Sequence, residues 1–113
     1  DTVTNELITA LSAFIGSFIN SHLMIISAQI QFIPLHSDTP MDRVDEAIAI
    51  IQASGLHYRV GPFGTSVEGE QSTINELVRE IQNLKTSPGF LLNVQYHIGE
   101  NRLSNDEKVA KFQ

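Results

Sequence analysis

The chain has 113 residues, of which 42% are hydrophobic and 18% are charged. These proportions are those of one globular domain and exclude an intrinsically disordered chain. Because there is no cysteine, disulfides, thiolate metal sites and cysteine nucleophiles are excluded as well. A net charge of −6 with scattered Lys and Arg residues predicts no nucleic-acid partner. The lack of cysteine is also typical of a reducing compartment, so we expect a cytoplasmic protein.

Residues 1–23 have a helical pattern of apolar side chains, with Thr4 as a candidate N-cap. The apolar face consists of Val3, Leu7, Leu11, Phe14 and Phe18. The segment has no signal-peptide features, and Ser and Gly residues interrupt it too often for a membrane span, so we expect no membrane partner. Two interpretations stay open. Either this helical extension packs on the domain or on a neighbouring subunit, or it is left over from a fusion that precedes a natural start at Met24.

From residue 24 the period changes to two, and the alternation over residues 24–33 predicts a strand that ends at Pro34. Thr39 as N-cap and Pro40 in the first turn then predict a helix. Gly55 is the expected C-terminal cap of that helix.

Two strands at residues 56–60 and 65–69, joined by a turn at 61–64, are predicted to form a hairpin. Thr73 and Glu76 have the spacing of a capping box and predict the start of the next helix. Its expected inner face consists of Ile74, Leu77, Val78, Ile81 and Leu84.

Alternation over residues 90–98 predicts a fourth strand, and Ser104 with Glu107 predicts a last short helix with Val109 and Phe112 turned inward. The order β-α-β-β-α-β is that of the ferredoxin-like α+β fold. We expect one such domain over residues 24–113, with both crossover helices on the same face of an antiparallel sheet.

The sheet face without helices is predicted to carry neutral polar side chains. They are Ser27, Gln29 and Gln31 on the first strand, and Asn93, Gln95 and His97 on the fourth, where a single histidine is more often structural. Amides both donate and accept hydrogen bonds, which suits the edge of a neutral heterocycle. A solvated sheet surface or a polar subunit interface explains the same pattern. Aliphatic neighbours on this face favour a surface covered in a homodimer or homotetramer: Ile25, Ile33 and Leu91.

The hairpin is the second candidate for ligand contacts. Gly64 permits close backbone approach, Thr65 offers a hydroxyl group, and Phe63 is able to stack on a ring. Ordinary turn chemistry explains these residues equally well. Glu68 follows on the strand, where a carboxylate either accepts hydrogen bonds from an aminopyrimidine or is simply solvated.

No catalytic or metal-binding signature is present. The four histidines lack metal-ligand spacing, and the chain contains neither a nucleophile elbow nor a phosphate-binding loop of known pattern. An acylphosphatase-like enzyme would share the fold, but it needs Arg and Asn in the first strand–helix loop, and residues 35–40 contain neither. We therefore expect no enzyme activity, no metal and no cofactor.

Three motifs occur in order along residues 24–113. They are Ile33-Pro34-Leu35, the stretch GLHYRVGPFGTSVEGE at 55–70, and a tail from Ile98 to Phe112 with Ser104, Glu107, Lys108 and Lys111. In this combination the chain resembles the thiamine-binding protein family, the YkoF-like group of small ferredoxin-like proteins.

The resemblance implies a non-enzymatic carrier or sensor that binds thiamine or its hydroxymethylpyrimidine part and assembles through its sheets into dimers or tetramers. Thr65 and Glu68 match the family motif directly, whereas the amide candidates are chosen because they share the open sheet face. The alternative is an oligomeric scaffold or regulatory interaction module that has no small-molecule ligand.

Overall fold

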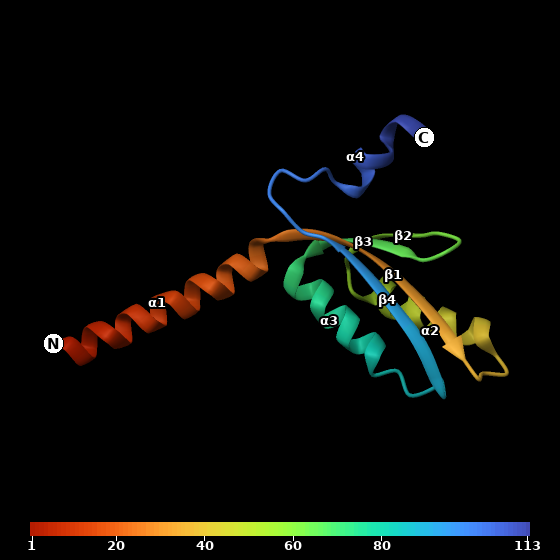
Figure 1. Ribbon diagram of the computed structural model, residues 1–113, viewed down its shortest axis with the longest axis horizontal. Helices are drawn as coiled ribbons and strands as arrows, with labels where there is room; N and C mark the ends of the chain where they lie inside the picture. Colours follow the sequence, from red (N-terminus) through yellow and green to blue (C-terminus); the bar gives the residue numbers. More distant parts are fainter.

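The computed structural model describes the backbone of residues 1–113 and the side chains of residues 1–16 and 24–113. Its elements are α1 (Thr2–Leu23), β1 (Ile25–Leu35), α2 (Pro40–Ala53), β2 (His57–Val60), β3 (Thr65–Glu70), α3 (Gln71–Gln82), β4 (Gly89–His97), α4 (Asn105–Val109) and a 3₁₀ turn (Ala110–Phe112). The strands form one antiparallel sheet in the order β2-β3-β1-β4 (Figure 1). The fold is therefore ferredoxin-like, as the sequence predicts.

The core lies between one sheet face and the helices α2 and α3. Alternate residues of β1 supply the sheet side, and the predicted inner face of α3 supplies much of the helix side. The largest fully buried side chains are Ile26, Val67, Ile74, Leu77 and Ile81. The period-two and helical patterns thus identified the two sides of the core correctly.

The strand β1 is longer than the predicted 24–33, because it continues through Pro34. It pairs with β3 only as far as Ile30 but with β4 as far as Leu35. Beyond Ile30, β1 is no longer paired with β3. Proline is tolerated at such an edge, where no ladder hydrogen bond from its nitrogen is needed.

Two predicted helix starts are wrong. The helix α1 begins at Thr2, and Thr4 is not its cap but donates its N–H to the carboxylate of Asp1. The helix α3 begins at Gln71, directly after β3, so Thr73 lies inside the helix and no capping box forms there. The backbone N–H of Gln71 donates to the carbonyl of Met24, and this contact with a distant segment accompanies the early turn into the helix.

The other helix ends follow the sequence more closely. Thr39 is the N-cap residue of α2, although its side chain makes no capping hydrogen bond. Gly55 has a φ of 76°, a left-handed conformation that glycine adopts without strain. Ser104 and Glu107 form both hydrogen bonds of the predicted capping box at the start of α4.

The helix α1 extends away from the sheet (Figure 1). Its predicted helical character is confirmed, and its described apolar side chains are exposed in the single chain: Val3, Leu7, Ile8, Leu11, Phe14 and Ile15. Phe18, the last member of the predicted face, lies outside the described side chains. Among the described residues, no helix is both long and apolar enough to span a membrane.

Packing of the β2–β3 turn against β1 is testable at Gly64. A Cβ atom there would lie 2.6 Å from Nε2 of Gln29 and 2.9 Å from the backbone carbonyl oxygen of Ile30. We expect Gly64→Ala to lower the free energy of unfolding by about 1–3 kcal/mol, because the buried strand cannot move aside. The measurement is urea denaturation.

The matched control is Gly99→Ala, since a Cβ atom at Gly99 meets nothing within 4 Å. Its effect should stay within about 0.5 kcal/mol. Equal stability of the Gly64→Ala variant and the unsubstituted protein would contradict the close packing of this turn.

Candidate functional site

The strand register sets the polar side chains of the open sheet face in rows. One row runs across the sheet through His57, Glu68, Ser27 and His97. The next row runs through Arg59, Ser66, Gln29 and Gln95. Gln31 and Asn93 are opposite each other one step further along. The predicted amides therefore come together on one surface.

Hydrogen bonds between strands orient these amides. The Ser66 hydroxyl group donates to Oε1 of Gln29 over 2.9 Å, and Nδ2 of Asn93 donates to Oε1 of Gln31 over 3.1 Å. Each glutamine is thus held by a neighbouring strand, which lowers the entropy cost of presenting it to a ligand.

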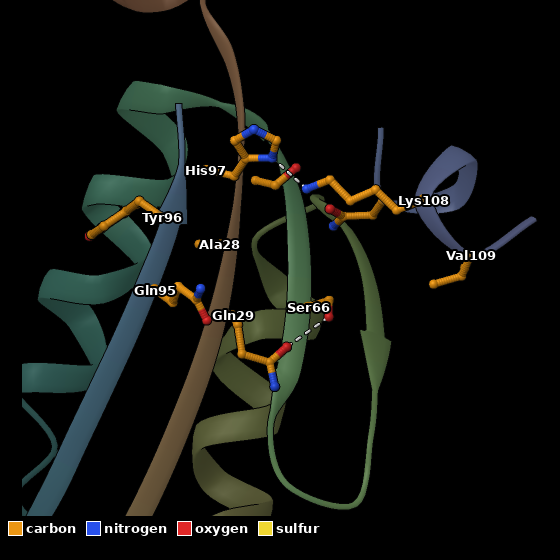
Figure 2. A pocket seen from close by; sticks show the side chains of 10 residues that line it. Ala28, Gln29, Ser66, Gln95, Tyr96, His97, Lys108 and Val109 are labelled. Carbon is orange, nitrogen blue, oxygen red and sulfur yellow. Dashed lines mark hydrogen bonds between the residues drawn. The ribbon is translucent and has the colours of Figure 1, made fainter. Parts of the chain in front are cut away.

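A pocket of about 260 Å³ lies between this face and α4. Its lining includes Ser27, Gln29, Ser66, Gln95, His97 and Lys108. Figure 2 shows Gln29, Gln95 and Ser66 on the strands, with Lys108 and Val109 facing them from α4. The short C-terminal helix therefore forms one wall of a pocket whose floor is the sheet.

Val109 and Phe112 were expected to turn inward, and that prediction is wrong for Phe112, whereas Val109 faces the pocket without being buried. Val109 is 36% exposed and Phe112 is 75% exposed. The helix α4 lies over a polar sheet face rather than over the core, so its apolar side chains have no apolar surface to pack against.

A buried ion pair holds the segment before α4 on the sheet. Nη1 of Arg102 lies 2.8 Å from Oε2 of Glu68 and donates to the Ser27 hydroxyl group over 2.8 Å, while Nε donates to the carbonyl of Ile25 over 3.1 Å. The backbone N–H of Asn105 also donates to Oε2 of Glu68. The two charged side chains are only 8% and 14% exposed, so this pair is largely shielded from water.

The same contacts keep Glu68 ionised. Partial burial raises the pKa of its carboxyl group, but hydrogen bonds from Arg102, Asn105 and Ser27, together with the guanidinium charge, bring the pKa below its usual value. Because Oε2 is engaged by these protein donors, Glu68 anchors the wall of the pocket. A ligand contact from its other oxygen stays a prediction.

The remaining predicted residues are distributed over different parts of the molecule. Gln31, Asn93 and the 79% exposed Phe63 surround a second, shallower hollow that shares Gln29 and Gln95 with the pocket. Gly64 packs against Gln29 at the end of the turn. Thr65 is 4% exposed and lies on the helix-covered face, because Ser66 and Glu68 occupy the open side of the same strand. Thr65 lines neither of the two open-face hollows.

Sequence reasoning placed His97 on the open face but gave it no ligand role, and it did not select Ser66, Arg102, Asn105 or Lys108. The alternation that identified Asn93 and Gln95 continues to His97, and Lys108 belongs to the tail motif. Arg102 lies in a loop with no pattern, and only the tertiary structure brings it to Glu68, 34 residues earlier.

Acid should weaken the Arg102–Glu68 contact in a predictable direction. Since folding lowers the pKa of Glu68, its stabilising contribution is present above the usual value of 4.5 and is lost as the pH falls through the lowered value. We expect Glu68→Gln to cost about 1–3 kcal/mol of unfolding free energy at pH 7. That deficit should shrink in urea titrations carried towards pH 3.

Glu80→Gln, at an exposed position of α3, is the matched control and should show no such convergence. A deficit for Glu68→Gln that is the same at every pH would argue against an ionised, paired Glu68.

Comparisons with known proteins agree with this architecture. The model of a family described as Thiamine-binding protein matches residues 28–112. A UPF0045 protein of Clostridium perfringens is 27% identical over 92 residues, which cover 76% of this chain and 95% of that protein.

Solved structures are also similar. A Thermotoga maritima protein, provisionally described as a thiamine biosynthesis/salvage protein, has a TM-score of 0.72 at 27% identity, with 79% of this chain and 99% of that chain covered. A domain of unknown function from Bacillus cereus has a TM-score of 0.71 at 24% identity over 80% of this chain and 91% of its own, and shows likeness of fold alone. With a family match that spans most of its length and includes the strands and helix of the pocket, this chain belongs to the thiamine-binding protein family.

Proposed function

We propose that the protein binds thiamine or a related aminopyrimidine such as hydroxymethylpyrimidine, without converting it, in the pocket between the open sheet face and α4. The observation that carries this proposal is the pair of carboxamides on the pocket floor, Gln29 and Gln95, which are directly opposite each other on β1 and β4. Membership of the thiamine-binding protein family supports the choice of ligand.

The chemistry of the amides suits an aminopyrimidine. Its edge presents an exocyclic N–H donor beside a ring-nitrogen acceptor, and a carboxamide offers the complementary pair, as Asn and Gln do towards adenine. Directly opposed residues on antiparallel strands have Cβ atoms about 4.5–5.5 Å apart, so one flat ring edge is able to reach both Gln29 and Gln95.

We propose binding rather than catalysis, in the role of a carrier or sensor. Carboxyl groups that act as general acids at neutral pH have a raised pKa, whereas the pKa of Glu68 is lowered by its partners. Glu68 lies beside the pocket, and the residues that line the pocket include no carboxylate. These features favour a site that orients a ligand over one that transfers protons.

A second candidate function is an oligomeric scaffold or regulatory module that uses the open face as its subunit interface. Ile25 is 49% exposed and Leu91 is 51% exposed beside the amides, which favours a covered surface. Dimers or tetramers through the sheets are compatible with ligand binding, because a second subunit would close the shallow hollow at Phe63, Gln31 and Asn93.

We also propose that residues 24–113 form the binding domain and that α1 is an extension outside the site. The residues that line the pocket fall between Ser27 and Val109, and the family match begins at Ala28.

Calorimetric titration tests the ligand. Thiamine or hydroxymethylpyrimidine should bind saturably, and Gln29→Ala or Gln95→Ala should weaken binding at least about tenfold, since each loses hydrogen bonds to the ring. Gln52→Ala, at an exposed position of α2, is the matched control and should bind like the unsubstituted protein.

Size-exclusion chromatography of the same variants separates the two candidates. Loss of binding with an unchanged assembly supports the aminopyrimidine site. Absence of saturable binding at millimolar ligand, together with a changed assembly in the Gln29→Ala and Gln95→Ala variants, would favour the scaffold instead.

A further inference from the structure

The charges around the pocket are distributed unevenly. Beside the pocket, the carboxylate of Glu68 is paired with the guanidinium group of Arg102 at 2.8 Å. Among the residues that line the pocket, Lys108 is the one with a permanent charge, and no acidic side chain accompanies it there. In a chain with a net charge of −6, the pocket lining thus carries one positive charge, while the acidic residues Asp106 and Glu107 of α4 lie outside that lining.

The contact made by Lys108 leaves this charge unbalanced. Its ammonium group is hydrogen-bonded to Nδ1 of His97, as Figure 2 shows. A lysine ammonium group only donates, so Nδ1 of the imidazole accepts in this contact. The bond positions the ammonium group at the pocket without cancelling its charge, and two of its three N–H groups stay available for a ligand.

The spacing of the two rows sets how far a ligand must extend from the amides to reach Lys108. His97 lies two residues beyond Gln95 on β4, and Ser27 lies two residues before Gln29 on the antiparallel β1. Two residues along a strand span about 6.6 Å. A substituent of a ring that is held at the amides therefore has to extend about this far along the strands to reach Lys108.

We infer that the site prefers phosphate monoesters of aminopyrimidine compounds to the free alcohols, with the phosphate group at Lys108. The inference rests on the proposed function and names its ligand more closely. A phosphate dianion satisfies the uncompensated ammonium group through charge-assisted hydrogen bonds. The free alcohol offers Lys108 only a neutral hydroxyl group. The thiazolium ring of thiamine is itself positively charged and is not attracted by the ammonium group of Lys108.

The experiment compares matched ligand pairs by calorimetry at low salt: hydroxymethylpyrimidine with its phosphate, and thiamine with its monophosphate. We expect the phosphorylated member of at least one pair to bind about tenfold more tightly. Comparison of the two pairs identifies which of the two phosphate esters the site prefers. The preference should decrease as salt is added, because Lys108 is exposed and its charge is screened.

Two lysine variants identify the group responsible. In Lys108→Met the affinity ratio within the preferred pair should fall close to one. Lys111→Met is the matched control, because Lys111 follows α4 by two residues and its Nζ lies 5.0 Å from the centre of the Phe112 ring. The Lys111→Met variant should keep the full ratio.

Equal affinities within both pairs for the unsubstituted protein would overturn the phosphate inference while leaving the aminopyrimidine site in place. A preference that survives Lys108→Met would overturn the assignment to this lysine. Failure of all four compounds to bind would instead refute the proposed function, and the phosphate preference with it.

Discussion

The contact between Arg102, Glu68 and Ser27 is the interaction on which the site depends. The helix α4 has no buried residue of its own, so apolar packing does not hold it against the sheet. The guanidinium group instead fixes the loop before α4 to β1 and β3, and Asn105 adds hydrogen bonds to Glu68 and to the carbonyl of Val67. A sheet face that would otherwise be flat and open thereby becomes one side of a pocket.

The same contact determines the electrostatic character of that pocket. A largely buried carboxylate without a partner would be costly, and Arg102 offsets this cost in a geometry in which Ser27 and Asn105 also engage Oε2. With this neighbouring acid paired, neutral amides and Lys108 dominate the lining. The proposed selectivity for a neutral ring with an anionic substituent therefore depends on a structural ion pair that need not touch the ligand.

The sequence predicted those parts of the molecule that depend on local periodicity. Alternation placed Gln29, Gln31, Asn93 and Gln95 on one face, and the antiparallel register then made them neighbours. The predicted start of α3 was wrong. Capping-box spacing at Thr73 is a local pattern, whereas the helix begins at Gln71, whose N–H donates to the carbonyl of the distant Met24.

The wall of the pocket was harder to predict for a related physical reason. Arg102 acts through a partner in another strand, and a single arginine in an irregular loop carries no periodic signal. The apolar residues Val109 and Phe112 suggested inward packing, but the surface beneath α4 is polar. Pairing over long distances and the polarity of the opposing surface are properties of the folded chain, and local patterns do not contain them.

A wall held mainly by polar contacts has a consequence for how a ligand enters. The last strand ends at His97, and the core is complete without the segment that follows it. Opening this segment exposes little apolar surface, so it costs far less free energy than global unfolding, and such low-cost local openings govern amide hydrogen exchange. The pocket is therefore able to open and close while the sheet and its two covering helices stay folded, and part of the binding energy of any ligand goes into keeping this wall closed.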